Sequence, residues 1–195
     1  MAVLSDADLL HLGGRLIEPF IPTNVQPNSI DVRLGQYVKY SNIPDGYVYD
    51  MRKEHLDDID YTERDLTKGD LIVPARRFCL GVTLETIKVP QVYSNYTGTF
   101  SLTAKIEGRS GVGRTGLCVV NAGRVDTGWE GKLTLELYNS EQFPITLFYG
   151  MPIAQVVYET TTSSVRVPYG TSELHSKYQG DTKPEPSKMW KNYAN

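Results

Sequence analysis

Residues 107–139 of this chain read EGRSGVGRTGLCVVNAGRVDTGWEGKLTLELYN and contain its most informative pattern. Its two apolar runs, at 116–123 and 132–139, are short and bounded by Gly and Asn. Runs of this length and composition are typical of β-strands. The stretch therefore predicts two strands joined by a glycine-rich connection.

Similar runs continue through most of the chain, from Ile30 to Glu159. They are rich in Val, Ile, Thr and Tyr, and Gly, Pro, Asn or Asp separates them. Closely spaced runs of this kind indicate a mainly β protein, an antiparallel barrel or sandwich of the jelly-roll kind, not alternating βα units. The ten runs cover residues 30–35, 37–42, 46–51, 70–75, 77–85, 100–108, 116–123, 132–139, 144–150 and 152–159.

The two ends of the chain differ from this β pattern. Ser5 and Asp8 form a capping-box pattern that predicts a short N-terminal helix within residues 1–14. The helix would end at Gly13 and Gly14, and three leucines would form its apolar face: Leu9, Leu10 and Leu12. We therefore expect a β domain at 1–160, followed by a tail at 161–195.

The tail is rich in Pro, Gly, Ser and Lys, so it should be poorly ordered unless it docks onto something. It carries Tyr169, Lys177 and Tyr178, which suit closure over an anionic aromatic ligand. A plain flexible tail is the alternative. The highly charged stretch 51–68 is expected to be a solvated surface loop.

Composition narrows the possible partners and location. The chain has 195 residues, a net charge of −3 and mixed signs, which argues against a nucleic-acid partner. No apolar run approaches the roughly 18 residues that a membrane span needs, and the N-terminus lacks a signal-peptide pattern. We expect a cytoplasmic protein in which Cys79 and Cys118 are free thiols.

Several types of catalytic site find no support in the residue pattern. The histidines are isolated and the cysteines are 39 positions apart, so a zinc site of the deaminase kind is not expected. There is no Walker loop, and sparse histidines disfavour a Ser-His-Asp triad. Carboxylate chemistry remains, and its candidates are Glu136, Asp126, Glu107 and Asp31.

Alternation in the run 132–139 places Leu133, Leu135 and Leu137 on one face of the strand, and Glu136 on the other. Glu136 could therefore simply face water. A carboxylate within an apolar run is nevertheless costly to bury, so a buried one would need a functional reason.

Just upstream of this run lie groups that suit a nucleotide. Arg109, Ser110 and Arg114 stand among glycines whose bare N–H groups can approach phosphate oxygens. Asp126 could accept a hydrogen bond from a sugar hydroxyl, and Trp129 could pack against the sugar or the base. The segment therefore indicates chemistry on a nucleotide.

The same segment resembles the dCTP deaminase branch of the trimeric dUTPase superfamily. EGRSGVGRTGL is similar to the family's EGRSSLGRLGL, and AGRVDTGWEGKLTLELYN is similar to its AG-x-IDPG(F/W)-x-G-x-ITLELxN. The similarity extends to VQPNSIDVRLG at 25–35, to PITLFYGMPIAQVVYE at 144–159 and to PYG and SKYQG within 168–180. On this resemblance the fold is expected to be dUTPase-like.

The resemblance implies a hydrolase that deaminates dCTP to dUTP and ammonia without zinc, in the supply of dTTP precursors. Glu136 would be the general base that activates water for attack on C4 of cytosine. Ser110 would help position the water or the phosphates, and Asp126 would bind the 3′-hydroxyl. The remaining substrate-binding residues would be Arg109, Gly111, Arg114, Ala122, Arg124, Trp129, Thr134, Leu135, Tyr169, Lys177 and Asp181.

The resemblance also implies a homotrimer with active sites between subunits. The nucleotide would carry Mg²⁺ held by its phosphates, so no metal-binding residues are expected in the protein.

Some residues depart from the deaminase pattern. Gly111 gives the RSG form that is found in dUTPases, and Asp126 follows Arg109 by 17 positions, one fewer than deaminases of the family usually have. The shortened loop 118–121 lacks the family's His. Asp181 replaces a Gln after KYQG, and the stretch around 91–104 contains an insertion with no functional account.

Three enzymatic activities fit these residues. A deaminase needs Glu136, whereas a dUTP diphosphatase would use Asp126 to orient water onto the α-phosphorus and release pyrophosphate. A bifunctional enzyme would convert dCTP to dUMP. A non-catalytic nucleotide-binding regulator is a fourth possibility, disfavoured by the retained Glu136, Asp126, Arg109 and Arg114.

Overall fold

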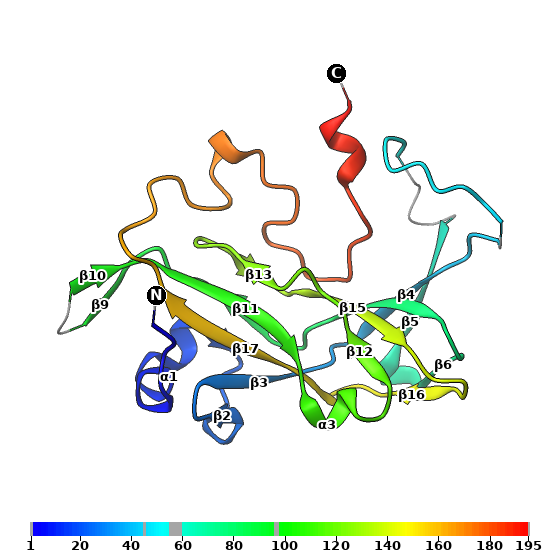
Figure 1. The fold of residues 1–195 in the computed structure, drawn as a ribbon, viewed down its shortest axis with the longest axis horizontal. Coiled ribbons are helices and arrows are strands. Elements are labelled where there is room, and N and C mark those ends of the chain that lie inside the picture. Colours follow the sequence, from blue (N-terminus) through cyan, green and yellow to red (C-terminus); the bar gives the residue numbers. More distant parts are fainter. Residues whose placement is uncertain (1, 45, 55–59, 96–97, 195) are drawn as a thin grey trace.

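The computed structural model describes residues 2–44, 46–54, 60–95 and 98–194. Two five-stranded antiparallel sheets pack as a sandwich along the long axis of the molecule (Figure 1). The first contains, in spatial order, β13 (Arg124–Val125), β11 (Leu102–Gly108), β17 (Pro152–Thr160), β3 (Ser29–Arg33) and β2 (Val25–Gln26). The second contains β12 (Leu117–Val119), β15 (Thr134–Asn139), β7 (Phe78–Val82), β4 (Tyr37–Ser41) and β5 (Tyr61–Asp65).

Smaller elements complete the sandwich. They are the three-stranded sheet of β1 (Ile17–Glu18), β8 (Thr86–Lys88) and β14 (Glu130–Gly131), the hairpin of β9 (Tyr93–Asn95) and β10 (Gly98–Phe100), and the pair β6 (Leu71–Val73) and β16 (Ile145–Leu147). The helices are α1 (Asp6–Leu12) and α3 (Ser110–Gly113), with 3-10 turns at Gly13–Arg15, Pro22–Asn24, Leu66–Lys68, Ser172–Leu174 and Met189–Asn192. The predicted mainly β fold is therefore confirmed as a sandwich and not a closed barrel.

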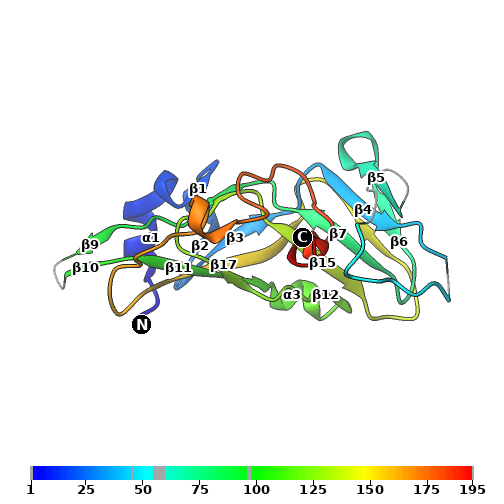
Figure 2. The same ribbon diagram turned by 90° about the horizontal axis from the view of Figure 1, so that it is seen from above.

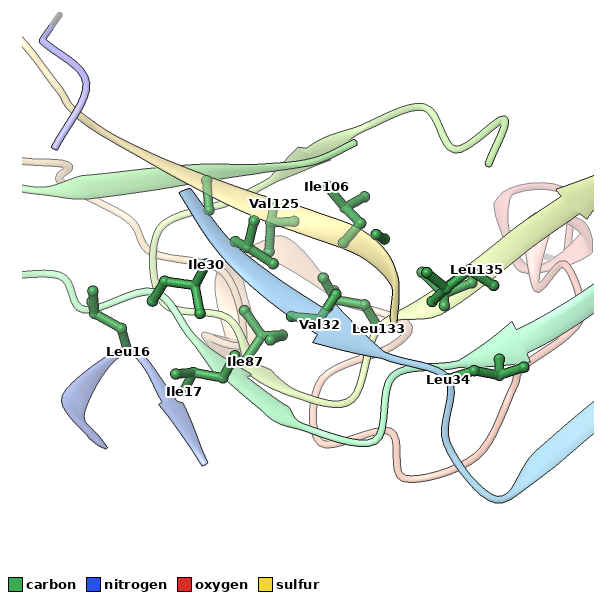
Figure 3. Packing of buried hydrophobic residues seen from close by; sticks show 14 of the residues in the cluster. Leu16, Ile17, Ile30, Val32, Leu34, Ile87, Ile106, Val125, Leu133 and Leu135 are labelled. Atoms are coloured by element: carbon green, nitrogen blue, oxygen red, sulfur yellow. The ribbon is translucent and has the colours of Figure 1, made fainter. Parts of the chain in front are cut away.

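A single hydrophobic core joins the two sheets. Its aliphatic side chains come from alternate positions of the strands, such as Val32 and Ile106 on the first sheet and Leu135 on the second (Figure 3). All three are at most 5% exposed. Burial of such side chains is the main contribution that holds the sheets together.

The N-terminal helix forms as its capping box predicts. The Ser5 hydroxyl accepts a hydrogen bond from the Asp8 main chain, and the Asp8 carboxylate accepts one from the Ser5 N–H. Gly13, with φ 43°, ends α1 in a conformation that favours glycine. Leu9 and Leu12 are buried, but the prediction for Leu10 was wrong, since it is 48% exposed.

Two expectations about strands were also wrong. Residues 46–51 form no strand, and Val48 within them is 84% exposed. The strand that pairs with β4 is instead β5. It lies within the charged stretch 51–68 and pairs with β4 along its whole length. Charged side chains are common on such edge strands, because they discourage further pairing. The predicted loop thus contains a strand.

The insertion around 91–104 forms the hairpin β9–β10, which projects at the end of the molecule near α1 (Figure 2). Tyr93 anchors it, since its buried hydroxyl donates a hydrogen bond to Asp8 at 3.2 Å. Both cysteines are free, as predicted. The described helices are all too short or too polar to cross a membrane.

Candidate active site

Strand β15 places Glu136 on the face opposite the core. Leu135 and Leu137 are fully buried, while Thr134, Glu136 and Tyr138 are only partly buried. Burial raises the pKa of the Glu136 carboxyl above its usual value of 4.5. Within the described part of the chain, no cationic side chain forms an ion pair with this carboxylate. A desolvated carboxylate without a counter-ion is a good proton acceptor near neutral pH.

Glu136 lines a cavity of about 480 Å³. The cavity gathers seven of the residues expected from sequence: Arg124, Asp126, Trp129, Thr134, Glu136, Tyr169 and Asp181. Apolar and aromatic walls with a few polar groups are usual for a small-molecule site. Tyr178, which sequence had also suggested for closure over a ligand, lies in the lining as well. Seven further residues complete it and were not expected: Tyr61, Phe78, Leu80, Val125, Leu133, Glu185 and Ser187.

Aromatic rings form one wall of this cavity. Trp129 is only 8% exposed and donates its indole N–H to the Gly131 carbonyl at 3.3 Å. Its ring lies 5.6 Å from that of Tyr169, at an angle of 48°. The two rings therefore form a fixed apolar surface beside the cavity.

A buried carboxylate on β17 holds the Arg124 side chain. The guanidinium contacts Glu159 at 3.4 Å and the Thr103 hydroxyl at 3.3 Å. Lys105 contacts the other carboxylate oxygen, also at 3.4 Å. Arg124 thus lies in the cavity wall, and Glu159 partly neutralises its charge.

A second hollow, of about 420 Å³, contains the expected phosphate-binding residues Arg109, Ser110 and Gly111. These residues begin α3 and lie beside β3, so that Arg109 forms an ion pair with Asp31 at 3.0 Å. Gln26 donates a hydrogen bond to the same carboxylate at 3.3 Å. The two hollows share no lining residue.

Other expected substrate-binding residues lie elsewhere in this chain. Arg114 and Ala122 are exposed and line neither hollow. Lys177 donates a hydrogen bond to Asn192 and also lies outside both. The Leu135 side chain is 0% exposed and faces the core, so only its main chain could contact a substrate.

The tail docks onto the body of its own chain. The Lys132 N–H donates to the Asp181 carbonyl at 2.8 Å, and the Glu185 N–H donates to the Thr134 hydroxyl at 3.0 Å. Lys183 contacts Glu63 on β5 at 2.8 Å. The tail therefore runs over the Glu136 cavity on the same side of the sandwich as β13 and β15 (Figure 1), and it supplies part of the lining.

The described residues contain no group of three or more His, Cys, Asp and Glu side chains arranged to hold a metal ion. Glu107, another carboxylate considered from sequence, is exposed on the outer face of β11 and lines neither hollow. Glu136, Asp126 and Asp181 are therefore the sequence-derived carboxylates that line the 480 Å³ cavity.

A family model described as dCTP deaminase-like matches residues 3–161. The chain belongs to the dCTP deaminase-like family. A relative from Methanosphaera stadtmanae, named "dCTP deaminase, dUMP-forming", is 34% identical over 97% of this chain and 94% of its own. One of the same name from Corynebacterium kroppenstedtii is 37% identical over 98% and 99%.

The fold is similar to the crystal structure of 2′-deoxycytidine 5′-triphosphate deaminase from Agrobacterium tumefaciens, with a TM-score of 0.60. The identity is 20%, and the match covers 82% of this chain and 48% of that one, so this likeness supports the fold alone. Membership of the dCTP deaminase-like family confirms the predicted resemblance, the dUTPase-like fold class and the assignment to the hydrolases.

Asp181 is a partly buried acid in the lining of the Glu136 cavity, and its charge should limit stability. Burial raises its pKa from 3.8 to about 6, although Lys188 lies 3.7 Å away. The folded state therefore binds the proton more tightly than the unfolded state, and the ionised carboxylate costs stability as pH rises from about 4 to above 6. Asp181→Asn removes that cost.

We expect Asp181→Asn to unfold at a higher temperature than the wild type at about pH 8, by the equivalent of about 1–3 kcal/mol. This gain should shrink on acidification and disappear near pH 4 in thermal unfolding curves. Exposed Asp70→Asn is the matched control. A difference between Asp181→Asn and the wild type that does not change with pH would contradict the assigned burial.

Proposed function

We propose that this protein is a dUMP-forming dCTP deaminase, which hydrolyses dCTP first to dUTP and ammonia and then to dUMP and pyrophosphate. The observation that carries the proposal is Glu136, a desolvated carboxylate that forms no ion pair with the described residues and lies in a cavity lined by Asp126, Arg124 and Trp129. The names of the relatives from M. stadtmanae and C. kroppenstedtii support the dUMP product.

In the first step, Glu136 removes a proton from water, and the hydroxide adds to C4 of the cytosine ring while N3 gains a proton. The N3 proton is the one that Glu136 took from water. The tetrahedral intermediate collapses as the added hydroxyl gives its proton, through Glu136, to the amino group, which leaves as ammonia while a C4 carbonyl remains. A base of this kind must be ionised, and its raised pKa increases its proton affinity. Ser110 helps to position the water or the phosphates.

In the second step, Asp126 orients water for attack on the α-phosphorus of dUTP, and the bond to pyrophosphate breaks. Gly111 and the spacing of 17 positions between Arg109 and Asp126 favour this activity. Mg²⁺ bound with the nucleotide would be held by its phosphates, which is consistent with the lack of a cluster of metal ligands among the described residues. No zinc takes part. A dUTP diphosphatase without deaminase activity is the second candidate, and Gly111 and the 17-position spacing also favour it.

The complete site forms between the subunits of a homotrimer. The hollow that holds Arg109, Ser110 and Gly111 is separate from the cavity of Glu136 on one chain, so a neighbouring copy brings the two together. Arg109 and Arg114 then contact the triphosphate, and Asp126 the 3′-hydroxyl. Residues 161–195 act as a lid, with Tyr169 and Lys177 closing over the nucleotide.

The products of dCTP test the proposed chemistry. The purified protein with dCTP and Mg²⁺ should release equal amounts of ammonia and pyrophosphate and leave dUMP. Glu136→Gln should lower ammonia release at least about 100-fold, because the general base is lost. The matched control is Glu107→Gln, an exposed carboxylate outside both hollows, which should retain the wild-type rate.

Three outcomes of this assay would change the account. Absence of ammonia from dCTP would exclude deamination, and pyrophosphate from dUTP alone would favour the diphosphatase. Nucleotide binding without turnover of either compound would favour a regulator.

Mixed assemblies test the shared site. Arg109→Ala and Glu136→Gln chains, each with a different affinity tag, can be co-expressed and the doubly tagged assemblies purified. Each variant alone should be nearly inactive, but in a mixed trimer about one of three sites combines intact Arg109 with intact Glu136. We expect about a third of the wild-type rate. Doubly tagged Glu136→Gln assemblies provide the control, and mixed assemblies no more active than they are would contradict a site between subunits.

A further inference from the structure

The main chain around Glu136 is held in an unusual way. Strand β12 pairs with β15 only as far as Val119, which lies opposite Leu137. One more main-chain hydrogen bond follows, from the Val120 N–H to the Glu136 carbonyl at 2.8 Å. The chain then turns away toward Gly123, before the strand pairing reaches Thr134.

The side chain of Asn121 completes the pairing where the main chain does not. Its Nδ2 donates a hydrogen bond to the Thr134 carbonyl at 2.8 Å, and its Oδ1 accepts one from the Glu136 N–H at 2.9 Å. A carboxamide carries the same acceptor and N–H donor as a peptide group, so it can replace one. As a result, residues 120 and 121 bind both polar main-chain groups of Glu136.

Asn121 lies in the connection between Arg109 and Asp126. Because Asn121 supplies a peptide-like group from its side chain, the strand pairing can extend beyond the end of β12 without another residue in that segment. Asp, Leu or Ala at this position could not make both hydrogen bonds, since a carboxylate only accepts and an alkyl group does neither.

We propose that Asn121 is a positioning residue, which holds the Glu136 main chain so that the carboxylate keeps a fixed direction into the cavity. The inference rests on the proposed role of Glu136 as general base. A general base must lie within hydrogen-bond reach of the water it activates, and an error of about 1 Å can reduce the rate on the order of 100-fold. Asn121 lines neither hollow, so it acts through Glu136.

Two variants separate positioning from general stability. Asn121→Leu keeps the size of the side chain but removes both hydrogen bonds. Asn121→Asp keeps the acceptor for the Glu136 N–H, loses the donor to Thr134 and adds a negative charge next to the general base. Ser140→Ala is the matched control, because the Ser140 hydroxyl joins the same two segments by a hydrogen bond to the Gly116 carbonyl at 2.8 Å, at the end of β15 far from Glu136.

For Asn121→Leu we expect ammonia release from dCTP with kcat at least about 10-fold lower and KM changed less than about twofold. For Asn121→Asp, the acid limb of the pH profile of kcat should also move to higher pH, because a like charge disfavours the ionised base. Arg124, Asp126, Asp181 and Glu185 line the same cavity in every variant, so they do not cause the difference. Ser140→Ala should change thermal stability alone.

The inference is overturned if both Asn121 variants keep the wild-type kcat and pH profile, or if Ser140→Ala lowers kcat as much as they do. If Asn121→Leu fails to fold, the acid limb of the kcat pH profile of Asn121→Asp tests the inference. Failure of the proposed function is separate, since it would appear as no ammonia from the wild type or an active Glu136→Gln. A wild type that needs Glu136 but tolerates both Asn121 changes would refute the inference alone.

Discussion

The two-residue period of β15 determines which way Glu136 faces, and the site is built around that direction. Leu135 and Leu137 are fully buried in the core between the sheets, so the strand cannot rotate or shift by one residue without exposing them. Glu136 must then face the opposite side, where a cavity and the tail partly bury it. The same hydrophobic packing that stabilises the fold thereby desolvates the carboxylate, and burial is the cause of its raised pKa.

The arginines and Glu136 differ in their ion pairing. Arg109 and Arg124 each have a carboxylate partner, Asp31 and Glu159 respectively, whereas Glu136 forms no ion pair within the described part of the chain. Paired arginines keep fixed positions and can still bind an anion with their remaining donors. A carboxylate without a cationic partner keeps its proton affinity, because no opposite charge stabilises its ionised form. This division suits a substrate with a charged triphosphate at one end and a neutral base at the other.

Local patterns in the sequence could predict much of this. The alternation of β15, the capping box of α1 and most strands follow from the period and the bounding residues, and the family motifs predicted seven residues of the main cavity. Residues 46–51 look like a strand but form none in the described structure, because β propensity reflects packing on a neighbouring strand. The charged strand β5 was missed for the opposite reason, since its backbone pairs with β4 whatever its side chains are.

Contacts between distant segments could not be predicted in the same way. The pairing of Arg109 with Asp31, the Phe78 and Tyr61 walls and the hydrogen bonds of Asn121 all depend on the register of strands that are far apart in sequence. The side-chain direction of Leu135 was available from alternation, yet the motif match placed it among the binding residues. A motif gives the position of a residue in the chain, whereas packing decides which of its atoms face the site.

The most direct test of the account is the pH dependence of kcat/KM for ammonia release from dCTP. This quantity reports the ionisation of the free enzyme's general base. We predict one acid limb, with activity rising as pH rises, and a midpoint above 4.5, the usual pKa of a glutamic acid, because burial disfavours the ionised form of Glu136. A midpoint at or below 4.5, or a rate without an acid limb, would contradict the claim that a desolvated Glu136 is the base.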